Sequence, residues 1–253
     1  ETVARLMKIP EYVELFNKAF GSNAITVENA QTAIAAFERT LISNNSPFDK
    51  YAAGQFDALT SQQRRGLNLF RSAATRCFEC HAAPTFGSDD FFVTGSPDLE
   101  GFPHDPGRAA IVSDGQDGAF KAPTLRNIAL TGPYMHNGAF ATLDDVLWFY
   151  EKGGGRQYGL EVDRHILPIE LSEQEHEDLV AFLYALTDES GMPEVPATTP
   201  SGLPVVEQYP NLAREVVSQL NVEVAESGVP AHEATVVRVG PNETIQQAVD
   251  RSG

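Results

Sequence analysis

The chain of 253 residues is short of three things that many proteins have. It has two cysteines, Cys77 and Cys80, so a zinc site has no second cysteine pair to complete it. It has 18 Lys and Arg against 35 Asp and Glu, for a formal net charge of −17. This balance argues against nucleic acid as a partner, and it fits either plain solubility or attraction to a basic partner or a cation.

Long apolar runs are also missing. No run approaches the roughly 20 residues that a membrane-spanning helix requires. No secretory signal pattern is present, but the chain opens on Glu1, so this absence says nothing of compartment. The 42% hydrophobic content is enough for a sizeable core in one or two domains.

Helical periodicity covers most of the first 188 residues. Apolar residues at helical spacing predict helices in EYVELFNKAF, residues 11–20, and in the stretch after Thr26, which is a suitable N-cap. Two Ser/Thr-x-x-Glu/Gln patterns, Thr60 with Gln63 and Ser172 with Glu175, predict capping boxes at the starts of two further helices. LDDVLWFYEKGGG, residues 143–155, predicts a short helix ended by glycines. The predicted fold class is therefore all-α.

Two segments lack helical periodicity. Residues 82–120 are rich in Gly, Pro, Asp and Ser, which predicts a long ordered loop, and such loops are usually functional. A Pro-rich acidic linker is expected over residues 189–230. After it, residues 231–253 pair an alternating strand with a Gly-Pro-Asn turn and a short amphipathic helix, and this piece resembles the opening of a parallel β-helix.

Both cysteines belong to the pentapeptide CFECH, in which His81 follows Cys80 directly. A thioredoxin-like redox pair would be expected in a βαβ context, which the pattern does not show. The pattern Cys-x-x-Cys-His is typical of covalent c-type haem attachment. Two thiols on one helical turn reach the two porphyrin vinyl groups as thioethers, and the adjacent imidazole lies under the iron. A tether of this kind offsets the entropy cost of holding a large flat cofactor.

A second stretch, FKAPTLRNIALTGPYMHNGAF, residues 120–140, makes the resemblance specific. Together with CFECH and the later LVAFLYALTD, it resembles the second haem domain of the bacterial di-haem cytochrome c peroxidase and MauG family. The resemblance implies a cytochrome c-like haem domain over residues 59–188. Residues 1–58 resemble the tail of the N-terminal haem domain, so a second haem, at which peroxide reacts, is expected upstream.

The resemblance also assigns roles to individual residues. It implies thioether attachment at Cys77 and Cys80, with His81 as the proximal iron ligand. It implies that the backbone carbonyls of Thr131 and Pro133 help to bind a calcium ion between two domains. Because haem c is attached outside the bacterial cytoplasm, it implies a periplasmic location.

The distal ligand decides the chemistry, and the resemblance places Tyr150 at that position. A phenolate favours ferric and higher iron states, whereas a methionine ligand raises the reduction potential. The alternatives are Met135, an open or water-ligated iron, and a purely structural Tyr150 in the core. Met192, in the linker, is a poorer candidate.

Two further residues of the same run are candidates for roles near the haem. His136 resembles a motif member with a hydrogen-bonding, catalytic role near the haem or the domain junction. Arg126 suits a haem propionate, because a guanidinium makes bidentate carboxylate contacts, and a structural salt bridge is the alternative. The remaining four histidines are interpreted as solvated: His104, His165, His176 and His232.

The sequence thus predicts an electron-transfer domain of a peroxide-dependent oxidoreductase that contains haem c. Its expected partner is a small electron-carrier protein or an oxidisable protein substrate. The first alternative is a simple electron-carrier cytochrome without catalysis. The second is a binding or tethering element of a β-helix protein in which the haem is structural.

Overall fold

The computed structural model describes residues 1–99, 101–113, 115–194, 196 and 198–202. These residues are rich in helix and contain little sheet, as the sequence predicts. The elements are α1 (Thr2–Leu6), α2 (Pro10–Phe20), α3 (Val27–Glu38), α4 (Pro47–Ala52), α5 (Ser61–Phe70), α6 (Cys77–Cys80), β1 (Phe91–Val93), η1 (Arg108–Ala110), β2 (Ala119–Lys121), η2 (Ile128–Leu130), α7 (Leu143–Glu151), η3 (Gly154–Tyr158) and α8 (Glu173–Tyr184). The predicted β-helix opening at 231–253 lies outside the described residues.

Side-chain caps set the starts of α3, α4, α5, α7 and α8. The Thr60 hydroxyl accepts a hydrogen bond from the Gln63 amide at 3.1 Å, and the Gln63 side chain accepts one from the Thr60 amide at 3.0 Å. Ser172 and Glu175 form the same reciprocal pair at the start of α8. Both predicted capping boxes are therefore confirmed. Each satisfies amide donors that the first helical turn leaves without intrahelical partners.

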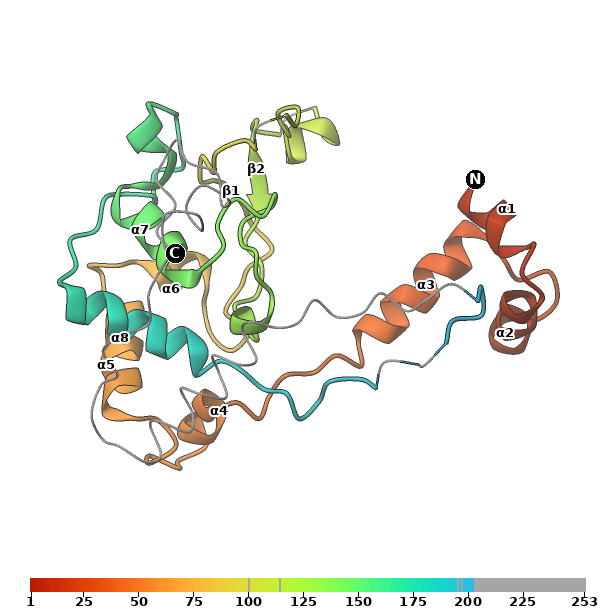
Figure 1. Ribbon diagram of the computed structural model, residues 1–253, viewed down its shortest axis with the longest axis horizontal. Coiled ribbons are helices and arrows are strands. Elements are labelled where there is room, and N and C mark those ends of the chain that lie inside the picture. The colour runs from red at the N-terminus through yellow and green to blue at the C-terminus, as the bar shows by residue number, and fades with distance from the viewer. Residues whose placement is uncertain (100, 114, 195, 197, 203–253) are drawn as a thin grey trace, which may run out of the picture. The chain divides into compact units, whose positions relative to one another are not determined.

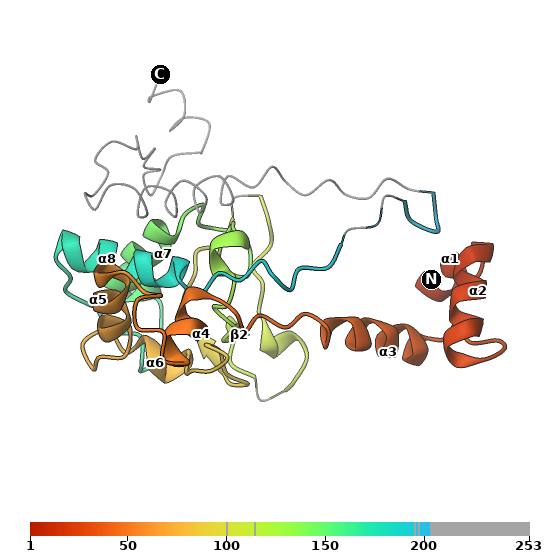
Figure 2. The same cartoon turned by 90° about the horizontal axis from the view of Figure 1, so that it is seen from below.

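The core forms where α5 packs against α8 (Figures 1 and 2). The apolar faces of the two helices supply Leu67, Phe70, Leu179 and Phe182, all of which are buried. The Phe70 and Phe182 rings lie 5.2 Å apart, and both also contact Phe86. Tilted and edge-on aromatic pairs of this kind stabilise a core beyond the area they bury.

Gly66 sets how closely the two helices approach. A Cβ atom at this position would lie 1.8 Å from the Asp178 carbonyl oxygen and 2.8 Å from the Phe182 Cβ. Backbone cannot move out of the way as a flexible side chain can, so any larger residue would push α8 away from α5.

Gly66→Ala is therefore expected to destabilise the fold by about 2–3 kcal/mol, the upper part of the usual cost of overpacking a core. The reason is the clash with Asp178 backbone. The free energy of unfolding in denaturant measures it. Gly132→Ala is the control, because Gly132 has no positive φ and a Cβ atom there would lie 3.5 Å from its nearest neighbour, an ordinary van der Waals contact. Equal stability of Gly66→Ala and the parent protein would contradict the close helix crossing.

The sequence predicted a long loop over residues 82–120, and this prediction was wrong in part, because the segment contains strand residues. Its two short strands, β1 and β2, pair antiparallel, with Phe92 opposite Phe120. Three-residue strands are too short to show the period-two alternation that predicts a strand. The pair places residues 91–93 beside residues 119–121, and so joins the two ends of the chain segment 94–118.

The predicted helices in residues 1–58 are present, but none of α1, α2 and α3 contains a buried residue. Large apolar side chains of α2 and α3 are exposed to solvent: Leu15 is 51% exposed, Ile34 59% and Phe37 52%. These apolar side chains are thus not covered by the other described residues.

No helix in the part of the chain that the structure describes is both long and apolar enough to span a membrane.

Candidate functional site

The two cysteines share one helical turn. Helix α6 consists of the four residues CFEC, and the His81 amide donates to the Cys77 carbonyl at 3.0 Å. Arg76, directly before α6, adopts a left-handed conformation with φ 59°, so the chain enters the turn sharply. Non-glycine residues in this region concentrate at functional sites. The geometry agrees with the single turn that the pentapeptide predicts.

Both thiols lie in surroundings that keep them protonated. Burial raises the pKa of Cys77. Burial, followed by the nearby carboxylates of Asp163 and Glu79, raises the pKa of Cys80 to about 11. Catalytic redox cysteines instead need a depressed pKa, because the thiolate is the nucleophile. The environment therefore disfavours the thioredoxin-like alternative.

His81 is held in one orientation by two backbone carbonyls. Its Nδ1 lies 3.0 Å from the Phe86 oxygen and 3.2 Å from the Pro123 oxygen. An Nδ1–H that donates to carbonyls leaves Nε2 as the ring nitrogen with a free lone pair, which is the usual arrangement of a metal-ligating histidine. Burial lowers the pKa of His81, which keeps the imidazole neutral and able to bind a metal.

Tyr150, near the end of α7, lies in the same part of the molecule as the two cysteines. Burial raises the pKa of the Tyr150 phenol far above its usual value, and the nearby Cys80 and Cys77 add to this shift. The structure thus brings the predicted distal residue into electrostatic range of both predicted attachment points. Its coordination of iron stays a prediction.

The side chains of Cys77, His81 and Tyr150 are partly buried, and burial is the largest cause of each pKa shift. Two protonated thiols on one turn, a neutral imidazole with a free Nε2 and a nearby phenol have the chemistry to hold a covalently attached haem c.

Arg126 has a structural role in the fold. Its guanidinium pairs with both carboxylate oxygens of Asp49, at 2.8 and 2.9 Å, and its Nε donates to the Pro84 carbonyl at 2.8 Å. This is the salt bridge that the sequence left open as the alternative to a propionate contact. A propionate contact by Arg126 stays a prediction.

Other predicted site residues lie apart from these contacts. His136 is exposed and stacks on Phe120 with ring centroids 3.8 Å apart, and burial lowers its pKa. Met135 adopts a left-handed conformation with φ 68°. The catalytic role of His136 and ligation by Met135 stay predictions.

The predicted calcium ligands are the carbonyls of Thr131 and Pro133, which follow η2. In the described part of the chain, no three His, Cys, Asp or Glu residues are grouped so that they could hold a metal ion. The calcium site that the resemblance implies would instead be made from backbone carbonyls. Calcium binding stays a prediction.

Three histidines that the sequence suggests are solvated have defined partners, and one of them, His104, contacts Asp98 and Asp117 while its side chain stays 52% exposed. The interpretation of His176 was wrong, because its side chain is 9% exposed and its two nitrogens contact Glu151 and Asp144. His165 contacts Glu79, the residue between the two cysteines, at 2.6 Å. Neither contact has a local sequence signal, because the partners lie 25 to 86 residues away. His232 lies outside the described residues.

The chain matches a protein-family model near its N-terminus. The model of the family described as di-haem cytochrome c peroxidase matches residues 1–57. This stretch contains no cysteine. The match is therefore independent of the CFECH motif.

Curated relatives match a larger part of the chain. It is 36% identical to cytochrome-c peroxidase IdrP1 of Pseudomonas sp. (strain SCT), in an alignment that covers 72% of this chain and 55% of the relative. It is 37% identical to the methylamine utilization protein MauG of Methylorubrum extorquens, over 77% of this chain and 55% of that relative. The chain thus spans about half the length of these relatives.

A solved structure agrees with the sequence relatives. A MauG-like protein associated with microbial copper homeostasis superposes with a TM-score of 0.61 at 35% identity, over 75% of this chain and 62% of that one. The diheme peroxidase BthA from Burkholderia thailandensis has a TM-score of 0.60 at 23% identity, which supports the fold alone.

Proposed function

This chain belongs to the di-haem cytochrome c peroxidase and MauG family, and from that premise we propose that it carries one covalently attached haem c and transfers electrons through it. Cys77 and Cys80 would hold the porphyrin as thioethers, and His81 and Tyr150 would bind its iron. When bound, the haem supplies one-electron redox chemistry. The protein's residues attach it, orient it and set its potential.

One observation carries the proposal. His81 directly follows the turn that contains both thiols, and its Nδ1 is hydrogen-bonded to the carbonyl oxygens of Phe86 and Pro123. A surface histidine has no need of two carbonyl partners on one nitrogen. A proximal ligand does, because they fix the ring and raise its basicity.

In the complete protein, we propose, a second haem reacts with hydrogen peroxide, and the haem on His81 shares the resulting oxidising equivalents. The reductant is a small electron-carrier protein or an oxidisable protein residue, and the working compartment is the periplasm. The names of the relatives, two cytochrome c peroxidases and MauG among them, support this reaction class. The 1–58 stretch would then belong to the neighbouring haem domain, which agrees with its uncovered apolar side chains.

A potentiometric titration of the haem-loaded chain tests the proposal. We expect one reversible one-electron couple at a low potential, because a phenolate ligand stabilises ferric iron. A couple at high potential with methionine-type spectra would support the simple electron carrier instead. A haem that does not cycle would contradict electron transfer altogether and leave a structural haem.

A further inference from the structure

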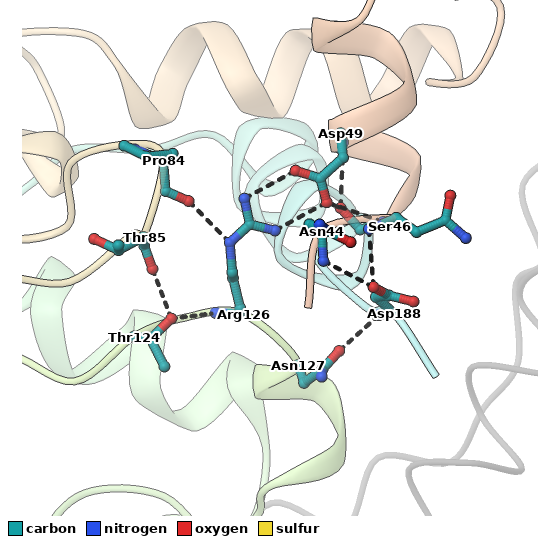
Figure 3. Close-up of polar contacts among 10 residues, drawn as sticks. Asn44, Ser46, Asp49, Pro84, Thr85, Thr124, Arg126, Asn127 and Asp188 are labelled. Atoms are coloured by element: carbon teal, nitrogen blue, oxygen red, sulfur yellow. Dashed lines mark hydrogen bonds and ion pairs between the residues drawn. The ribbon is translucent and has the colours of Figure 1, made fainter. Parts of the chain in front are cut away.

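Figure 3 shows a polar network that joins four segments distant in sequence. Arg126 makes its bidentate ion pair with Asp49, and the two side chains are 14% and 17% exposed. Asp49 also accepts hydrogen bonds from the Ser46 amide and hydroxyl, in the capping box of α4. The carboxylate is therefore fixed from two sides, and it fixes the guanidinium in turn.

The residue after Arg126 extends the network to a third segment. Asn127 adopts a left-handed conformation with φ 61°, and its side-chain oxygen accepts from the Asp188 amide at 2.6 Å. The Asp188 carboxylate accepts from the amides of Asn44 and Asn45 at 2.9 and 2.8 Å. Segments 44–49, 126–127 and 186–190 are thereby tied together.

Residues 124–126 are also tied to the loop after His81. Arg126 Nε donates to the Pro84 carbonyl at 2.8 Å, the Thr124 hydroxyl donates to the Thr85 carbonyl at 2.6 Å, and the Leu125 amide donates to the Phe86 carbonyl at 2.9 Å. Three consecutive residues of one segment thus bind three consecutive carbonyls of the other.

These two segments are the ones that hold the imidazole. His81 Nδ1 contacts the Phe86 oxygen on the first segment and the Pro123 oxygen on the second. The distance between the two carbonyls depends on how residues 84–86 and 123–126 are held together. Arg126 is the charged residue that links the two segments, through its hydrogen bond to the Pro84 carbonyl. Asp49, which belongs to neither segment, fixes the position of the Arg126 guanidinium.

We propose that Arg126, oriented by Asp49, is a positioning residue for the proximal ligand His81. It acts through the Pro84 carbonyl, which keeps the 84–86 loop against residues 123–126, and so keeps both carbonyls on the imidazole. The inference rests on the proposed function, since it takes His81 as the ligand of haem iron.

The physical effect follows from ligand basicity. An imidazole whose Nδ1–H donates to carbonyls is a stronger electron donor to the metal, and this stabilises the ferric state. Loosening the loop weakens those hydrogen bonds and shifts the equilibrium toward reduced haem. Lysine cannot replace arginine here, because it cannot bind both carboxylate oxygens and the Pro84 carbonyl with one planar group.

The experiment compares Arg126→Lys and Asp49→Asn with the parent protein, all loaded with haem. We expect each to raise the ratio of reduced to oxidised haem at a fixed ambient potential by about threefold to tenfold, where tenfold corresponds to about 59 mV for one electron. Arg65→Lys is the matched control, because Arg65 makes a bidentate pair with Asp178 between α5 and α8. The control is expected to lower stability and leave the ratio unchanged.

Three results would overturn the inference. An unchanged ratio in both variants means that the network is only structural. A shift in Arg126→Lys without one in Asp49→Asn means that Arg126 contacts the haem directly, as a propionate partner would. An equal shift in Arg65→Lys means that general loosening is the cause. Haem content is measured first, since loss of covalent haem from the parent protein would contradict the proposed function instead.

Discussion

Replacing Tyr150 by phenylalanine is expected to convert the haem-loaded chain from a six-coordinate to a five-coordinate or water-ligated iron. Burial raises the pKa of the Tyr150 phenol, and the two cysteines lie near enough to add to the shift, so the proposal makes this phenol a ligand of the haem that they would attach. A nearby cation deprotonates a coordinating group despite its burial. Visible absorption and electron paramagnetic resonance measure the change, and loss of the low-spin ferric signal should be nearly complete.

Tyr184→Phe is the matched control for this substitution. Burial also raises the pKa of Tyr184, but that tyrosine lies on α8, and its charged neighbour is Asp144 rather than a cysteine. We expect it to leave the spectra unchanged. Identical spectra for Tyr150→Phe and the parent protein would exclude Tyr150 as the ligand. Met135→Leu would then test the methionine alternative.

Replacing Cys77 and Cys80 together by alanine is expected to abolish covalent haem retention. The two thiols are the chain's only cysteines, so no other sulfur can form a thioether. Each single variant should keep the haem through one bond. Extraction with acidified organic solvent, followed by absorption of the protein fraction, measures the retained pigment.

Phe78→Leu is the control for the double cysteine variant, because Phe78 lies between the cysteines and is 40% exposed. It should retain haem like the parent protein. Covalent pigment in the double cysteine variant would mean that attachment occurs elsewhere, and the assignment of the CFECH turn would be wrong.

Local signals in the sequence were sufficient for the helices and for the haem motif. The capping boxes at Thr60 and Ser172 depend on residues three positions apart, so the sequence shows both partners. The turn at Cys77 and Cys80 is equally local. Such features are predictable because the contact and the pattern lie in the same few residues.

The contacts that build the site are different, because their partners are far apart in the chain. Asp49 and Arg126 are 77 positions apart, and Pro123 lies 42 positions from His81. His176 was misjudged for the same reason, since nothing next to it indicates Glu151. The run PTLRN was recognised by resemblance, but only the structure shows that its members hold the 84–86 loop and the 44–49 segment.

Every role proposed for the site residues requires a haem bound covalently to Cys77 and Cys80. The most direct measurement is to produce the unsubstituted chain together with a haem-maturation system, denature it, and test for attached haem and for free thiols. We predict that the denatured chain stays red and that neither thiol reacts with an alkylating reagent. A colourless chain with two alkylated cysteines would contradict the account.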